Sequence, residues 1–166
     1  MKRKNQKRTR FVTLSAVIAA LYVVLTLLAN AIGLANQTIQ LRFSEALCAL
    51  AFFTPAAIPG LTIGCFLSNL IIQAPPLDLI FGTLATFIGV VGGYLLRKNK
   101  WLVTLPTVIS NTVIIPFVIV YGYMGTPDPS LLLINAAFVF LGEFISATLL
   151  GTGLLRVLKR YNFKFN

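Results

Sequence analysis

The sequence predicts an all-α integral membrane protein, a six-transmembrane-helix bundle with both termini in the cytoplasm. Composition is the first reason: 57% of the 166 residues are hydrophobic, only 11% are charged, and the mean hydropathy is +0.87. So few charges cannot cover a folded domain in water. The second reason is charge placement, because 13 of the 14 Lys and Arg residues fall in clusters at 2–10, 97–100 and 156–164. Long apolar stretches separate these clusters, and the positive-inside bias places all three in the cytoplasm.

Six apolar segments carry the predicted helices. Four are long enough to cross the hydrocarbon, which takes about 20 residues of helix; they lie near 11–33, 77–96, 101–123 and 131–155. The stretch 43–72 is interrupted by prolines and a glycine, so it is interpreted as two short helices near 43–54 and 60–73. A single span there would place the second and third basic clusters outside, against the charge bias.

The same bias assigns the connections between helices. Outer loops are predicted near 34–41, 73–76 and 124–130, with a tight inner turn near 54–59. The first of these loops is the longest and is polar enough to act as a flap. Residues 1–10 form a basic cytoplasmic segment, 11–156 form the membrane domain, and 157–166 form a basic cytoplasmic tail.

Several functional classes are disfavoured. The chain has a net charge of +10, but its basic residues flank apolar spans and do not alternate with aromatic residues as in a nucleic-acid-binding motif. Anionic lipid headgroups therefore fit the basic clusters better than nucleic acid does. Cys48 and Cys65 lie in apolar segments without paired spacing and are predicted to be buried free thiols. The chain has no His, no phosphate-binding loop and no nucleophile elbow, so we expect neither an enzyme nor a metal or cofactor in this chain.

Polar side chains inside the spans are the candidate binding residues, because a charge at the bilayer centre costs ~2.5–3.5 kcal/mol on insertion scales. Glu143 is the first candidate, since it lies near the middle of the last span on one face with Asn135 and Ser146. The other candidates lie near helix ends or are neutral amides: Arg42, Glu45, Asp78, Asn69, Gln73 and Asn111.

Each of these other candidates has a structural alternative. Arg42 and Glu45 are three residues apart, as in an ion pair on one helix face. Asp78 follows two prolines at a predicted helix start, where an acid can cap the helix. The amides are equally suited to interhelical hydrogen bonds, which are worth only ~0.6 kcal/mol on average.

Small residues recur at a spacing of about four on three helices, which lets helix backbones approach closely. They are Ala16 and Ala20 on the first helix, Gly60, Gly64 and Ser68 on the third, and Gly82, Thr86, Gly89 and Gly93, in one row with Asp78, on the fourth. On the first helix two interpretations stay open: packing within the bundle, or a smooth face for a partner protein.

The most distinctive segments of the chain are IQLRFSEAL at 39–47, FFTPAAIPGL at 52–61 and GCFLSNL at 64–70. They closely resemble the QueT family of queuosine-precursor transporters, and the resemblance extends along nearly the whole chain. Members of that family look like substrate-binding S components of energy-coupling factor (ECF) transporters. Such components are small six-helix proteins of the cell membrane that join a coupling transmembrane subunit and two ATPase subunits.

The resemblance implies a ligand and a docking face. The ligand is a 7-deazaguanine such as preQ1 or queuine, taken up from outside, and Ala16-x-x-x-Ala20 matches the signature by which S components dock their coupling subunit. Glu143 is the expected acceptor for the adjacent N–H donors of the guanine-like edge. The remaining roles are neutralisation of an aminomethyl cation by Asp78 or Glu45, hydrogen bonds from Asn69, Asn111 or Gln73, and stacking by Tyr121.

Three alternatives remain at this point. The chain resembles an S component, but the substrate is a different vitamin-like molecule. It is a stand-alone carrier that uses Glu143 as a proton site, although 166 residues without a visible inverted repeat is small for one. Or it is a scaffold that binds no small ligand.

Overall fold

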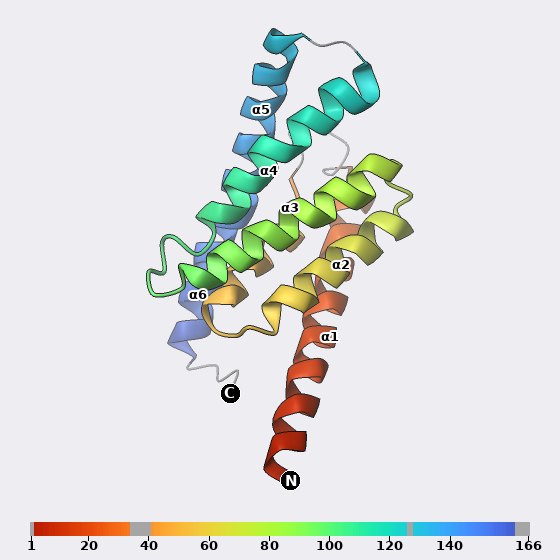
Figure 1. The fold of residues 1–166 in the computed structure, drawn as a ribbon. Coiled ribbons are helices and arrows are strands. Elements are labelled where there is room, and N and C mark those ends of the chain that lie inside the picture. The colour runs from red at the N-terminus through yellow and green to blue at the C-terminus, as the bar shows by residue number, and fades with distance from the viewer. Residues whose placement is uncertain (1, 34–40, 126–127, 162–166) are drawn as a thin grey trace.

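The structure is a computed structural model, which describes residues 2–33, 41–125 and 128–161. All regular structure in these residues is helical, as predicted. The elements are α1 (Lys2–Ala31), the 3₁₀-helix η2 (Phe43–Phe52), α2 (Ala57–Ile71), α3 (Pro76–Leu95), α4 (Leu105–Phe117) with its π-helical continuation η3 (Val118–Met124), and α5 (Pro129–Glu143), which continues through the π-helical η4 (Phe144–Leu150) into α6 (Gly151–Arg160). The described chain thus forms six helical rods (Figure 1).

Four of these rods are long and apolar enough to span a bilayer: Lys4–Ala31, Pro76–Leu95, Leu105–Met124 and Pro129–Arg160. Three boundaries differ from the prediction by four residues or more: the start of the first helix, the start of α4, and the end of α6, which lies at Arg160 rather than near 155. The helix α2 also starts at Ala57 rather than near 60, so the turn predicted near 54–59 is shorter. The first helix starts at Lys2, because the basic segment before residue 11 contains no Pro or Gly to stop it. The helix α4 starts at Leu105 rather than near 101, since Pro106 suits the first turn of a helix.

The short helix η2 is almost wholly surrounded by protein. Seven of its ten residues are buried, and it contacts α1, α2, α3, α6 and η4. A 3₁₀-helix rises about 2.0 Å per residue, so ten residues cover about 20 Å, less than the hydrocarbon thickness. It therefore sits as a plug in the centre of the bundle and carries Glu45 there.

Glycines allow the helices around this plug to pack closely. A Cβ on Gly64 of α2 would lie 2.7 Å from the Cβ of Tyr22 and 3.0 Å from the carbonyl oxygen of Ala19 on α1. On α3, a Cβ on Gly89 would lie 2.6 Å from the Cα of Thr107. The small stripes predicted for α2 and α3 are therefore contacts within the bundle.

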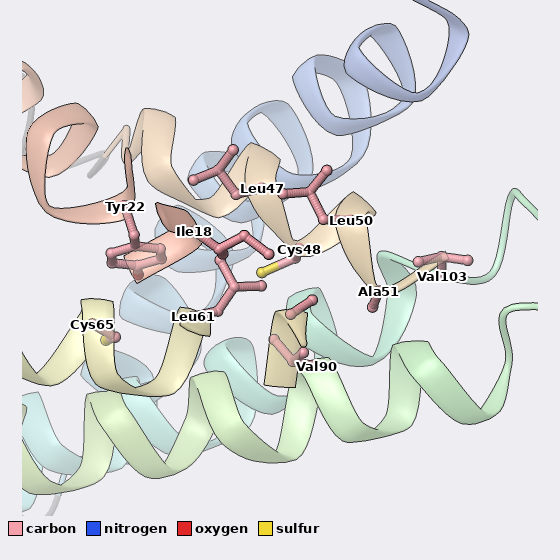
Figure 2. Packing of buried hydrophobic residues seen from close by; sticks show 11 residues of the cluster. Ile18, Tyr22, Leu47, Cys48, Leu50, Ala51, Leu61, Cys65, Val90 and Val103 are labelled. Carbon is pink, nitrogen blue, oxygen red and sulfur yellow. The ribbon is translucent and has the colours of Figure 1, made fainter. Parts of the chain in front are cut away.

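The apolar core lies where α1, η2, α2 and α3 meet. Figure 2 shows Ile18 and Leu61 beside Cys48, with Cys65 on α2 and Val90 on α3. Both cysteines are buried and free, as predicted. In Figure 1 the loop between α3 and α4 lies beside α6, and the start of α1 lies at the bottom of the view.

Candidate binding site

Two acids lie inside the bundle, on helices that pack against each other. Glu45 of η2 is 1% exposed, and Glu143, at the junction of α5 and η4, is 9% exposed. The π-helical turn η4 contacts η2 directly, which brings the two acids into the same region. A carboxyl group at such a depth needs hydrogen-bond donors, so the partners of each acid decide its role.

Glu45 is supplied with donors by the protein itself. The Tyr22 hydroxyl from α1 donates to Oε1, and the Cys48 thiol, one turn along η2, donates to Oε2 at 3.3 Å. Each carboxyl oxygen therefore has a partner. The bond from Tyr22 also joins α1 to the plug, which makes Glu45 part of the bundle's internal framework.

Glu143 lacks such a set. Its Oε2 is buried without a hydrogen-bond partner among the described residues. The side-chain amide of Asn111 on α4 faces the carboxyl, and Glu45 and Arg42 lie within electrostatic range. One Asn111 N–H is already used, because it donates to the carbonyl of Thr107 at 3.2 Å. The Glu143 carboxyl therefore retains accepting capacity.

Other buried polar atoms on the neighbouring helices also lack partners among the described residues. They are Oδ1 of Asn69 on α2, Oδ1 of Asp78 on α3, and the hydroxyls of Thr107 and Thr112 on α4. A buried polar atom without a partner costs ~1–3 kcal/mol. Three of the five such atoms, on Asn69, Asp78 and Glu143, are acceptor oxygens, which only a donor can satisfy.

Contacts across the bundle connect several of these groups. The Asn69 amide donates to the carbonyl of Asp78 at 3.5 Å, which joins α2 to α3. The charge of Arg42 acts on Asp78 as well as on Glu143 and Glu45. The backbone N–H of Arg42 donates to the Ser146 hydroxyl at 3.2 Å, fixing the entry to η2 against η4. Six of the sequence candidates thus belong to one polar region: Arg42, Glu45, Asn69, Asp78, Asn111 and Glu143.

Two structural alternatives from the sequence are corrected. Among the described residues Arg42 forms no ion pair with Glu45, because Tyr22 and Cys48 occupy that carboxyl instead. Asp78 does not cap α3, since Pro75 holds the N-cap position and Asp78 lies within the first turn. Its backbone N–H donates to the carbonyl of Pro75 at 2.9 Å and to the Tyr123 hydroxyl at 3.0 Å.

Three further residues lie apart from this region. Gln73 follows the end of α2 and is exposed, with a left-handed backbone (φ 54°) that turns the chain off the helical stripe. The Tyr121 ring is 49% exposed and stacks on Phe117, with 5.7 Å between ring centroids. Asn135 donates to the carbonyl of Leu131 in its own helix at 2.8 Å. The predicted flap at 34–41 falls outside the described residues, except Leu41.

Tyr22 and Thr112 were not singled out from the sequence. A lone tyrosine in the middle of the first apolar span is a signal that was available, since a buried phenol needs a hydrogen-bond partner. Thr112 gives no such signal, because threonine hydroxyls in helices commonly bond to their own backbone.

The face of α1 opposite the bundle is open. Ala16 and Ala20 are exposed and line a groove of about 680 Å³ together with Val12 and with Ile63 and Leu67 of α2. The side chain of Ile18, by contrast, lies in tight contact with Gly60, where an added Cβ would be 2.9 Å from the Cβ of Ile18. The small stripe on α1 is therefore not used in packing within the described bundle.

These features define a multi-pass membrane protein with an acid-containing polar interior. Residues 12–160 match the family model described as QueT transporter, and the chain belongs to that family. Over 93 residues it is 39% identical to the "Queuosine precursor transporter QueT" of Lactococcus lactis subsp. cremoris, a match covering 56% of this chain and 54% of that relative. The aligned part thus spans about half of the relative's length. No solved structure matches the chain.

Proposed function

We propose that this chain is the substrate-binding S component of an ECF-type importer, which captures a queuosine precursor outside and delivers it inward. Membership of the QueT transporter family supports a transport role, and the name of the Lactococcus relative supports the class of substrate. The observation that carries the proposal is the set of buried acceptor oxygens without donors on Asn69, Asp78 and Glu143. A donor-rich guest would satisfy them.

A 7-deazaguanine such as preQ1 or queuine has the complementary chemistry. The adjacent N–H donors of its guanine-like edge pair with the two oxygens of the Glu143 carboxylate in a charge-assisted contact. Asn111, which faces that carboxyl, hydrogen-bonds the ring carbonyl. Asp78 neutralises the cation of an aminomethyl group, with Asn69 beside it. Arg42 offsets the mutual repulsion of the acids in the unliganded protein.

The partners follow from the open face of α1. The groove lined by Ala16 and Ala20 accepts a helix of the coupling subunit, because small residues permit close backbone approach. ATP hydrolysis is then supplied by two ATPase subunits. The chain itself provides recognition and carries no cofactor.

The decisive experiment is ligand binding by the purified chain in detergent. We expect preQ1 or queuine to raise the melting temperature, because a ligand that binds only the folded state stabilises it, while unrelated vitamins do not. Glu143→Gln should weaken the affinity measured by calorimetry roughly 30-fold or more, as for truncation of a buried charged contact. Asp128→Asn is the matched control: it removes an acid at the start of α5 but retains a capping side chain.

Unchanged affinity of the Glu143→Gln variant would reject this carboxyl as the acceptor. A transport assay separates the proposal from a stand-alone carrier: vesicles containing the chain alone should not accumulate the base, whereas vesicles that also hold coupling and ATPase subunits should. Uptake by the chain alone that collapses with the proton gradient would favour the carrier.

A further inference from the structure

A cavity lined by cations lies away from the two buried acids, neither of which lines it. It has a volume of about 330 Å³ and lies between the loop after α3 and the helix α6. Four of its lining residues are cations, namely Lys100, Arg156, Lys159 and Arg160. None of the chain's four acids lines it. Among the described residues, this concentration of positive charge has no counter-charge in the cavity.

The cations on α6 are arranged on one face. Arg156, Lys159 and Arg160 stand at positions i, i+3 and i+4, so their side chains project in the same direction. The guanidinium of Arg156 lies 5.6 Å from the centre of the Trp101 ring, and the Lys100 ammonium lies 5.2 Å from the same ring. Trp101 therefore holds cations from both walls of the cavity.

Both walls are fixed in position. On one side, the Asn99 side chain accepts from the backbone N–H of Trp101 at 3.1 Å and orders the loop. The hydroxyls of Thr104 and Thr148 lie 3.3 Å apart and join the start of α4 to η4. On the other side, a Cβ on Gly151 would lie 3.2 Å from the carbonyl oxygen of Ala46, so α6 packs closely on η2. Contacts within the fold therefore hold both walls of the cavity in place.

Its surroundings are those of a membrane interface. Trp101 is 54% exposed, and tryptophan is enriched where its ring can sit at headgroup level. Apolar side chains of the adjoining helices, Leu105 on α4 and Val157 on α6, are exposed nearby in the chain. Figure 1 shows the loop after α3 beside α6, at the ends of two long apolar rods. A ligand with a phosphate head and acyl chains matches this combination.

We propose that the cavity formed by Lys100, Trp101, Arg156, Lys159 and Arg160 is a binding site for the phosphate headgroup of an anionic phospholipid. The phosphodiester accepts hydrogen bonds from the two arginines and the lysines. The acyl chains follow the apolar surface of the neighbouring helices. A pocket of about this size is sufficient for a small polar head, since ligand sites start near 300 Å³. The bound lipid would fasten α6 to the loop after α3.

The chain contains a direct reporter of this site, because Trp101 is its only tryptophan. The experiment is a titration of the purified full-length chain with phosphatidylglycerol carrying brominated acyl chains, which quench tryptophan fluorescence on contact. Phosphatidylcholine with the same chains is the comparison. We expect phosphatidylglycerol to quench at a lower mole fraction, and we expect added salt to reduce this preference.

Matched variants test the residues. Arg156→Gln and Lys159→Gln should each reduce the preference for phosphatidylglycerol about fivefold, the factor equivalent to ~1 kcal/mol per cation near an anionic surface. Arg97→Gln and Lys98→Gln remove the same charges from the same side without touching the cavity. Arg97 packs on the Tyr94 ring at 3.7 Å instead. These two controls should retain the preference, and gel filtration should show that all four variants are folded.

Three results would overturn the proposal. Equal quenching by the two lipids would show that the headgroup is not recognised. If the cavity variants and the controls lost the preference for phosphatidylglycerol equally, the preference would come from the overall positive charge of this part of the protein and not from the cavity. Displacement of the brominated lipid by low concentrations of glycerol phosphate would assign the cavity to a free phosphate compound rather than to a lipid.

Discussion

The two buried acids have the same side chain and opposite surroundings. Glu45 receives one donor from Tyr22 on α1 and another from Cys48 on its own helix. Glu143 keeps a buried oxygen without a partner among the described residues. The first acid lies where α1, η2 and α2 are packed most closely, and the second lies where α4 and α5 leave polar atoms unmatched.

This contrast separates structure from recognition. A buried carboxyl whose donors come from the protein stabilises the bundle and has little left to offer a ligand. A buried carboxyl that lacks donors carries a free-energy cost until something supplies them. The proposed substrate would supply them, so the two acids are expected to respond differently to substitution.

The largest effect is expected from disrupting the closely packed side. Gly64→Val would place new atoms against the Tyr22 side chain and the Ala19 backbone, which cannot yield without separating α1 from α2. We expect a loss of about 1–3 kcal/mol or more in the free energy of unfolding, measured by thermal unfolding in detergent. Gly153→Val is the control, because no atom lies within 4 Å of a Cβ there. Equal effects of the two changes would mean that close packing at α1 is unimportant.

An intermediate effect is expected from Tyr22→Phe, which removes one donor from Glu45. The buried carboxyl oxygen loses its partner, so stability should fall by about 1–3 kcal/mol. Ligand affinity should stay within about twofold, because the Tyr22 hydroxyl donates to Glu45 and not to the proposed acceptor Glu143. Thermal unfolding would measure the stability, and calorimetry would measure the ligand affinity. A loss of affinity as large as that of Glu143→Gln would place Glu45 in the ligand site and remove the contrast.

The smallest effect is expected from Thr112→Val. The Thr112 hydroxyl is buried without a partner among the described residues, so its removal should change stability by less than about 0.5 kcal/mol or improve it. Thr26→Val makes the same chemical change on the satisfied side. That hydroxyl donates at 2.9 Å to the carbonyl of Tyr22 and contacts Ser44 at the same distance. Thermal unfolding should therefore show a loss of ~1 kcal/mol for Thr26→Val; the reverse order would contradict the comparison.

The sequence was informative about the residues of the interior and poor at ranking them. Six of its candidates lie in one polar region, because a charge or amide in an apolar span must face the protein interior. Gln73 and Tyr121 lie outside this region. A helix extended past Ile71 would have carried Gln73 along the stripe of Asn69, but the left-handed turn at Gln73 ends it. Tyr121 lies on a π-helical turn, whose register differs from that of an α-helix.

The sequence by itself determined that this protein is helical and multi-pass, that its basic residues gather in three clusters, and that it resembles the QueT family. The helical class and the charge clusters depend on composition and local periodicity, and the resemblance depends on short sequence segments; none of these requires knowledge of which helices touch. Only the tertiary structure decided which acid is satisfied, because the donors of Glu45 and the neighbours of Glu143 come partly from helices far away in the chain. It also decided that cations from the loop after α3 and from α6 share one cavity with Trp101. Hydrogen bonds and charges act over a few ångströms of space, and linear spacing cannot supply those distances between helices.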